Sequence, residues 1–151
     1  MGVADGLVTA CGGFLIAVLW MDLIFDTQVR TERGAVLPEA TLSSIAAYYR
    51  RATTTSRPMS RLIAVVMVIL LGALAFRALR GNDAAWFTAS SVVLAAAPVL
   101  LGLFRTVPNA VRLGARTDDA AGQSRLARSI FRDHIACLAA MALLVVLTLV
   151  W

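Results

Sequence analysis

The fold class follows from stretches such as RSIFRDHIACLAAMALLVVLTLVW (residues 128–151), in which a charged beginning gives way to an apolar run. An apolar segment of about 20 residues crosses the ~30 Å of a bilayer's hydrocarbon layer as a helix. Residues 130–151 form a segment of that kind, and so do residues 7–25, 58–79 and 84–104. Because backbone donors and acceptors in lipid must pair within their own segment, all four segments are predicted to be membrane-spanning helices.

The overall composition supports the same conclusion. Hydrophobic residues make up 60% of the 151 residues, and the mean hydropathy is +0.80. An ordinary soluble domain contains roughly 45–50% apolar residues, so a soluble core would not absorb this excess. The sequence therefore predicts an all-α integral membrane protein. Residues 1–151 are expected to form one domain, an antiparallel four-helix bundle.

Arginine supplies all fourteen basic residues, and all except Arg77 and Arg80 fall within residues 30–61 and 105–132. Basic residues close to span ends accumulate on the cytoplasmic side of a membrane. Both arginine-rich loops are therefore expected in the cytoplasm, and both termini on the outer side of a bacterial inner membrane. The net charge of +5 then reflects topology, and no nucleic-acid partner is predicted.

The first arginine-rich loop contains an amphipathic pattern over residues 38–53. Apolar residues at Leu42, Ile45, Ala46 and Tyr49 follow the i, i+3, i+4, i+7 spacing of one helix face. This segment is predicted to be an additional interfacial helix that lies on the inner membrane surface. The alternative is a lid over a site or a docking face for a partner.

Polar residues from all four spans are expected at the inner ends of the bundle. They are Asp22, Asp26, Arg57, Arg61, Arg105, Asn109, Arg128, Arg132, Asp133 and His134. Asp22 has apolar neighbours in sequence, and a carboxylate at membrane depth needs a partner inside the bundle. We expect Asp22 to pair with Arg61 or Arg132 and Asp26 to lie nearer water. The alternative for Asp22 is a catalytic or proton-handling carboxylate.

His134 is the second candidate for catalysis. It begins a helical stripe with Cys137, Met141 and Thr148, so its ring is expected to point inward. Its reference pKa near 6.5 suits proton transfer, but a lone histidine at such a position is more often an interfacial hydrogen-bonding group than a base. The predicted ligand-binding residues are Asn109, His134, Arg61, Arg105 and Arg132. Pro98 is expected to kink its helix, which would widen the bundle near these residues.

Neither a metal nor a cofactor is predicted. One histidine cannot supply both axial ligands of a bis-histidine haem, and no cluster has the spacing of metal ligands. Cys11 and Cys137 fall near opposite ends of their spans, on the order of 20 Å apart in depth, so a disulfide is not expected.

The second half of the chain resembles a known family. Residues 106–109, Thr-Val-Pro-Asn, and residues 128–141, RSIFRDHIACLAAM, are similar to the Val-Pro-x-Asn element and the last helix of the anthrone-oxygenase-like family of small four-span membrane proteins. Asn109 and His134 match polar positions of that pattern, whereas residues 135–137 depart from its arginine-containing continuation. The resemblance implies cofactor-independent oxygenation of an activated polycyclic phenol.

Three classes of function fit these patterns. The first is a membrane protein that binds or transforms an amphipathic small molecule at the inner polar residues. The second is a non-catalytic accessory or structural subunit of a larger membrane complex, in which the same residues tie helices together. The third, a small multidrug exporter, is disfavoured because such exporters assemble from oppositely oriented protomers and need balanced charges. Besides lipid, a further copy of the chain is a plausible partner.

Overall fold

The computed structural model describes residues 2–32, 34–81 and 83–151, and its described part is helical without any strand. The elements in chain order are α1 (Val3–Asp26), α2 (Gln28–Thr31), α3 (Glu39–Thr54), α4 (Arg57–Arg80), α5 (Ala85–Leu101), the π-helical turn η1 (Gly102–Thr106), α6 (Val107–Ala115) and α7 (Ala120–Val150). The all-helical fold class is therefore confirmed.

Four helical units are long and apolar enough to cross a membrane: Val3–Thr31, Arg57–Arg80, Ala85–Ala115 and Ala120–Val150. They cover the four predicted segments except for residues 84 and 151, and the first, third and fourth extend well beyond those segments at the arginine-rich end. The last unit begins at Ala120 because the side chain of Asp119 caps it, accepting a hydrogen bond from the Gly122 amide at 2.7 Å. Consequently, most of the arginine-rich segment 105–132 is also helical.

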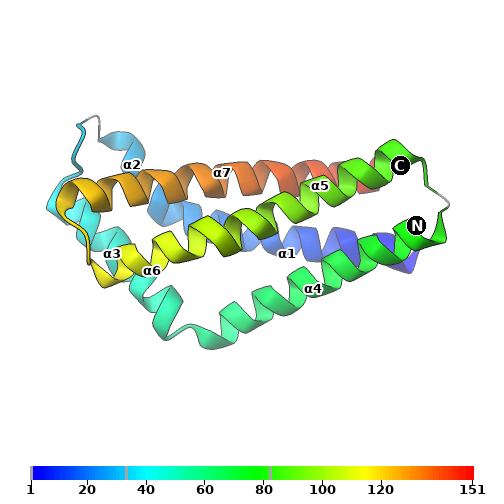
Figure 1. Cartoon of the computed structure of the whole chain (residues 1–151), viewed down its shortest axis with the longest axis horizontal. Helices are drawn as coiled ribbons and strands as arrows, with labels where there is room; N and C mark the ends of the chain where they lie inside the picture. The colour runs from blue at the N-terminus through cyan, green and yellow to red at the C-terminus, as the bar shows by residue number, and fades with distance from the viewer. Residues whose placement is uncertain (1, 33, 82) are drawn as a thin grey trace.

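The long helices lie side by side along the long axis of the molecule (Figure 1), with both termini at one end and α3 at the other. At the end with the termini, Arg77 of α4 connects neighbouring parts of the chain. It pairs with Asp5 of α1 at 2.8 Å and with Asp83, just before α5, at 3.0 Å. Because tryptophan is typical of membrane interfaces, the sequence predicts Trp86 and Trp151 on one face, and their ring centroids lie 5.0 Å apart at this end.

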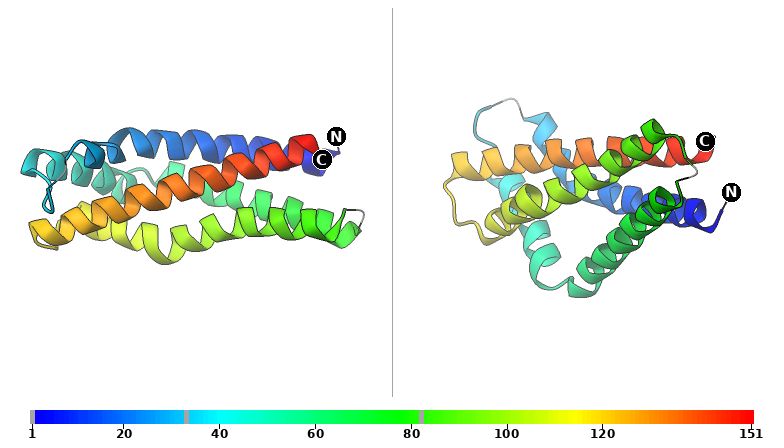
Figure 2. Two further views of the ribbon diagram at one scale, coloured as in Figure 1. Left: turned by 90° about the horizontal axis from the view of Figure 1, so that it is seen from above. Right: turned by 45° about the vertical axis from the view of Figure 1, so that its right-hand side comes forward.

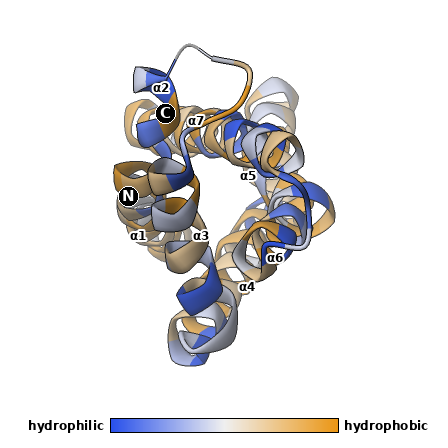
Figure 3. Ribbon diagram, turned by 90° about the vertical axis from the view of Figure 1, so that its left-hand side faces the viewer, coloured by the Kyte–Doolittle hydropathy of each residue, from blue (hydrophilic) through white to orange (hydrophobic). Residues whose placement is uncertain are grey.

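Two apolar cores fill the two ends of the bundle. One core joins α1, α4, α5 and α7 near the termini, and the other joins α3, α6 and α7. Many large apolar side chains remain on the outside, among them Val68, Phe104 and Leu143. An outer surface of this kind suits contact with lipid. Figure 3, which views the α3 end, shows hydrophilic segments in α2, α3 and α6.

The amphipathic segment is helical as predicted, but its apolar face meets protein. Leu42, Ile45, Ala46 and Tyr49 are all buried, three of them in the core shared with α6 and α7. The apolar face of this helix is thus covered by α6 and α7, and the position of the helix on the inner membrane surface stays a prediction. Figure 2 shows α3 folded against the other helices at the end opposite the termini.

Several local signals act as expected, and others do not. Gly81 ends α4 with a left-handed φ of 65°, and Pro58 lies in the first turn of α4. The sequence offers Asn82 or Asp83 as the cap of α5; Asn82 lies outside the described residues, and the carboxylate of Asp83 binds Arg77 and does not cap the helix. The sequence also predicts that the first span continues as helix through Arg33, which lies outside the described residues; α1 ends at Asp26 and α2 at Thr31.

Candidate functional site

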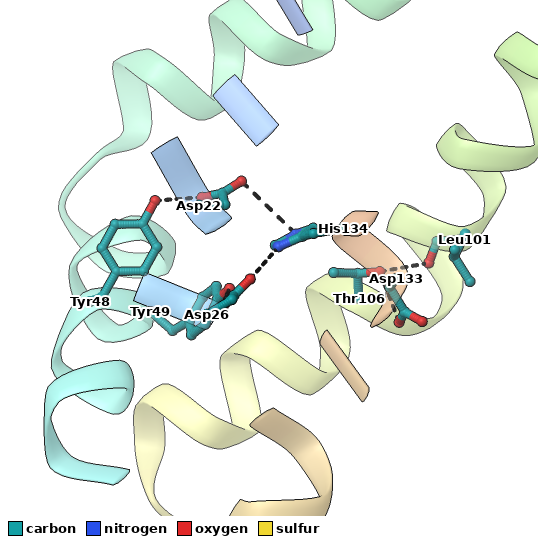
Figure 4. Close-up of polar contacts among 8 residues, drawn as sticks. All are labelled: Asp22, Asp26, Tyr48, Tyr49, Leu101, Thr106, Asp133 and His134. Carbon is teal, nitrogen blue, oxygen red and sulfur yellow. Dashed lines mark hydrogen bonds and ion pairs between the residues drawn. The ribbon is translucent and has the colours of Figure 1, made fainter. Parts of the chain in front are cut away.

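Five polar side chains from three helices meet inside the α3 end of the bundle (Figure 4), and we call them the His134 cluster. Its members are Asp22, Asp26, Tyr48, Tyr49 and His134. The two aspartates lie one turn apart on α1, which places them on one face. The tyrosines are neighbours on α3, and the histidine is on α7.

The tightest contact in the cluster is a buried carboxylate–histidine pair. Nδ1 of His134 lies 2.6 Å from Oδ2 of Asp26, and the Tyr49 hydroxyl donates to Oδ1 of the same carboxylate at 2.6 Å. Asp26 is 1% exposed and His134 is 7% exposed. Because an ionised carboxylate only accepts hydrogen bonds, Nδ1 of His134 is the donor to Asp26, and in the neutral form of the ring Nε2 is then the acceptor.

The Nε2 side of the His134 ring, which faces Asp22, is less enclosed by other side chains. Nε2 lies 3.9 Å from Oδ2 of Asp22, which is too far for a direct hydrogen bond. Tyr48 donates its hydroxyl to Oδ1 of Asp22, and its ring stacks on Phe25 with centroids 4.1 Å apart. The Asp22 side chain is 21% exposed, so the gap between Nε2 and Asp22 lies on the more accessible side of the cluster.

Both tyrosines act as donors to the carboxylates. Burial, together with the neighbouring Asp22 and Asp26 carboxylates, raises the pKa of Tyr49 far above its ordinary value. Burial and the hydrogen bond to Asp22 raise the pKa of Tyr48 in the same direction. Both hydroxyls therefore keep their protons at neutral pH, and α3 supplies fixed donors that hold the two aspartates around the ring.

A second set of polar contacts lies on a neighbouring face of α7, around Asp133. Asp133 is buried and pairs with Arg105 at 3.2 Å, while the Thr106 hydroxyl donates to it at 3.3 Å. Arg105 also donates to the Ser129 hydroxyl, at 3.0 Å from its Nη2. Thr106 belongs to the π-helical turn η1, so this irregular turn places a hydroxyl and a guanidinium opposite Asp133.

The structure brings together only some of the residues predicted from the sequence. Asp22 and His134 meet, but Asp22 pairs with neither Arg61 nor Arg132, which are exposed. That predicted ion pair is wrong because Tyr48 and His134 occupy the space around Asp22. Asp26 was expected nearer water, yet it is the more buried aspartate since Tyr49 and His134 enclose it.

The remaining predicted ligand-binding residues lie apart from the His134 cluster. Arg105 binds Asp133, and Asn109 lines a cavity together with Arg132. The predicted inward stripe of His134, Cys137, Met141 and Thr148 is buried as expected, and both cysteines are free. The tyrosines were missed as site residues, although Tyr49 occupies the apolar face of an amphipathic helix, where a hydroxyl needs a buried partner.

Comparison with known proteins adds no family to this description. The chain matches no protein-family model, no curated protein and no solved structure. Within residues 2–32, 34–81 and 83–151, no group of three or more histidine, cysteine or acidic residues is arranged to hold a metal ion. The fold and the site thus define a multi-pass helical protein with a buried carboxylate–histidine–tyrosine cluster.

Proposed function

We propose that this chain is an antiparallel four-span protein of a bacterial inner membrane that binds an amphipathic small molecule at the His134 cluster. In this proposal the arginine-rich loops and α3 face the cytoplasm. The contact of Arg77 with Asp5 supports the antiparallel arrangement, because it joins the last turn of α4 to the first turn of α1. The contact of His134 with Asp26 joins α7 to the other end of α1. The ligand would approach from the Asp22 side.

The observation that carries the proposal is the unequal use of the two ring nitrogens. Asp26 fixes the ring through Nδ1 at 2.6 Å, whereas Nε2 has only the 3.9 Å gap to Asp22 in front of it. A hydroxyl placed in that gap can donate its proton to Nε2, as in general base catalysis. The carboxylates on both sides would stabilise the imidazolium that this transfer produces.

The proposed ligand is a membrane-soluble phenol. A phenolic hydroxyl has a proton acidic enough to pass to an imidazole, and its ring can lie among apolar side chains. Residues 106–109 and 128–141 resemble the anthrone-oxygenase-like family, whose implied substrates are activated phenols, and this resemblance favours the same ligand class. The step that we assign to His134 is only the transfer of the phenolic proton to Nε2.

Binding of 2-naphthol tests this assignment, because its neutral and deprotonated forms differ in fluorescence. The purified wild-type protein in detergent should bind it saturably and shift its emission toward the deprotonated form. His134→Gln should lower the affinity at least about tenfold, since a hydrogen bond to a charged group is lost. Cys137→Ala is the matched control, because Cys137 lies one turn away on the same buried face.

The outcome that would overturn the proposal is equal binding by wild type and His134→Gln, or no saturable binding by wild type. Circular dichroism and thermal melting of each variant show whether it is folded, so that a lost site is not confused with a lost fold. Mass spectrometry of gently purified protein then asks whether a small phenolic compound accompanies the wild type and is absent from His134→Gln.

The proposed orientation is tested by reporter fusions. Positive residues near span ends set topology, so a reporter active only in the cytoplasm should work after Gly34 and fail after Trp151. A reporter active only outside the cytoplasm should give the reverse pattern at the same two positions. If the cytoplasmic reporter worked only after Trp151, the arginine-rich end and the His134 cluster would lie on the outer side.

A second candidate function is that of an accessory subunit, and the position of α4 favours it. The first half of α4 stands apart from α1 and α6 in Figures 1 and 2, and the buried residues of this helix are Leu70, Ala73 and Leu74, all in its second half. Met59, Leu62 and Val65 are exposed there and would suit a partner helix. Other membrane subunits in the gently purified sample, without a small molecule, would support this function.

A further inference from the structure

A second charged site lies outside the His134 cluster, between α6 and the first turns of α7. A cavity of about 430 Å³ opens there, and none of the five cluster residues lines it. Its polar lining residues are Asn109, Arg112, Asp118, Arg125, Arg128, Ser129 and Arg132. Four arginines and one aspartate give this lining a net charge of +3.

Two of the four arginines have protein partners that account for them. Arg112 binds Asp118 at 2.5 Å, and Arg128 donates to the backbone carbonyl oxygens of Gly34 and Ala35. Arg125 and Arg132 have no carboxylate within ion-pair distance in the part of the chain that the structure describes. Because they lie seven residues apart on α7, both guanidinium groups leave the helix on one face.

The cavity lies at the depth of lipid headgroups in a spanning bundle. α7 has 31 residues and is about 46 Å long, whereas the hydrocarbon layer is ~30 Å thick. If its C-terminal end reaches one edge of that layer, its first ten or so residues extend beyond the other edge. Arg125 belongs to this extension, and Arg132 stands at its border with the apolar part of the helix.

An exposed apolar stripe continues from the arginines along the same face of α7. Successive steps of three or four residues after Arg132 keep one helix face. The exposed residues at these steps are Ala136, Ala139, Leu143 and Val146. A cationic cavity thus leads directly into an outward-facing apolar stripe, an arrangement that matches an anionic headgroup followed by an acyl chain.

We propose that this cavity binds the phosphate of an anionic phospholipid, with Arg125 and Arg132 as its principal ligands. A guanidinium group presents paired N–H donors that match phosphate oxygens, and basic pockets between spanning helices are suited to lipid headgroups. Asn109 adds an amide donor. The Ser129 hydroxyl accepts from Arg105 and so retains its own hydrogen for a phosphate oxygen.

The experiment compares lipid binding to two double variants that lose the same charge. Native mass spectrometry of the delipidated protein counts bound phosphatidylglycerol and, in parallel, bound phosphatidylcholine. Arg125→Gln/Arg132→Gln removes the proposed ligands, and Arg57→Gln/Arg61→Gln removes two exposed arginines of the other arginine-rich loop. We expect the first variant to bind phosphatidylglycerol at least about tenfold more weakly than wild type, because two cations near the surface are lost from the site.

The control variant should retain nearly wild-type affinity, and phosphatidylcholine should bind weakly to all three proteins. Inorganic phosphate, added as a competitor, separates the two sources of a phosphate group. If it displaces phosphatidylglycerol completely at millimolar concentration, the site is for free phosphate and the lipid proposal is overturned. Equal weakening in both double variants, or equal binding of the two lipids by wild type, would overturn it as well. Since the four substituted arginines, Arg57, Arg61, Arg125 and Arg132, are all exposed, circular dichroism should show every variant folded.

Discussion

Replacing Asp26 by alanine is expected to lower the free energy of unfolding by about 3–5 kcal/mol, because it leaves two buried hydrogen-bond donors unsatisfied at about 1–3 kcal/mol each. The substitution leaves Nδ1 of His134 and the Tyr49 hydroxyl without acceptors in a region where Asp26 itself is 1% exposed. Asp22→Ala removes the acceptor of one tyrosine hydroxyl at a more accessible position and should cost only about 1–2 kcal/mol. Chemical unfolding of the purified protein in detergent measures both values.

A double-mutant cycle shows whether the Asp26 effect arises from the pair with His134. Asp26→Ala/His134→Ala should be less destabilised than the sum of the two single variants, because the second change removes the group that the first leaves unpaired. Asp26→Asn keeps the shape and an acceptor oxygen, so it should cost less than Asp26→Ala. A larger loss for Asp22→Ala than for Asp26→Ala would contradict the geometry described for the cluster.

The sequence predicted Asp22 as the buried aspartate, but Asp26 is the more buried of the two. This difference shows what the sequence can predict and what it cannot. The spacing of Asp22 and Asp26 places both on one face of α1, and the spacing of His134, Cys137 and Met141 places the ring inside. These statements concern single helices: the first agrees with the proximity of both aspartates to His134, and the second with the burial of His134, Cys137 and Met141. Which aspartate is enclosed depends on α3, whose position is set by contacts distant in sequence.

The predicted ion pair of Asp22 with an arginine was wrong for a related reason. An arginine side chain is long and flexible, so Arg61 and Arg132 both looked able to reach a carboxylate at the same end of the bundle. The periodicity of residues 38–53 correctly gave the buried face of α3, but a period does not say whether lipid or protein covers that face. Once α3 lies on α6 and α7, Tyr48 and Tyr49 fill the space in which the arginines were expected.

The position of α3 depends in turn on a close contact with α6. A Cβ atom at Gly114 would lie 2.7 Å from the backbone nitrogen of Arg50 and 3.0 Å from its Cα. The neighbouring carbonyl carbon of Tyr49 is also only 3.0 Å from that point. These are backbone atoms of a helix, which cannot turn aside as a side chain can, so any larger residue at position 114 must push α3 away from α6.

Gly114→Ala is therefore expected to destabilise the protein by about 1–3 kcal/mol, the usual cost of overpacking, despite the better helix propensity of alanine. Gly13→Ala is the matched control, because a Cβ there meets nothing within 4 Å; the same exchange should be neutral or stabilise by up to about 1 kcal/mol. Gly114→Ala should thus lower the midpoint of chemical unfolding, and Gly13→Ala should leave it unchanged or raise it. Since Tyr48 and Tyr49 move with α3, Gly114→Ala should also weaken 2-naphthol binding, which Gly13→Ala should leave unchanged. A Gly114→Ala protein with wild-type stability would show that α3 does not pack against α6 as closely as these distances require.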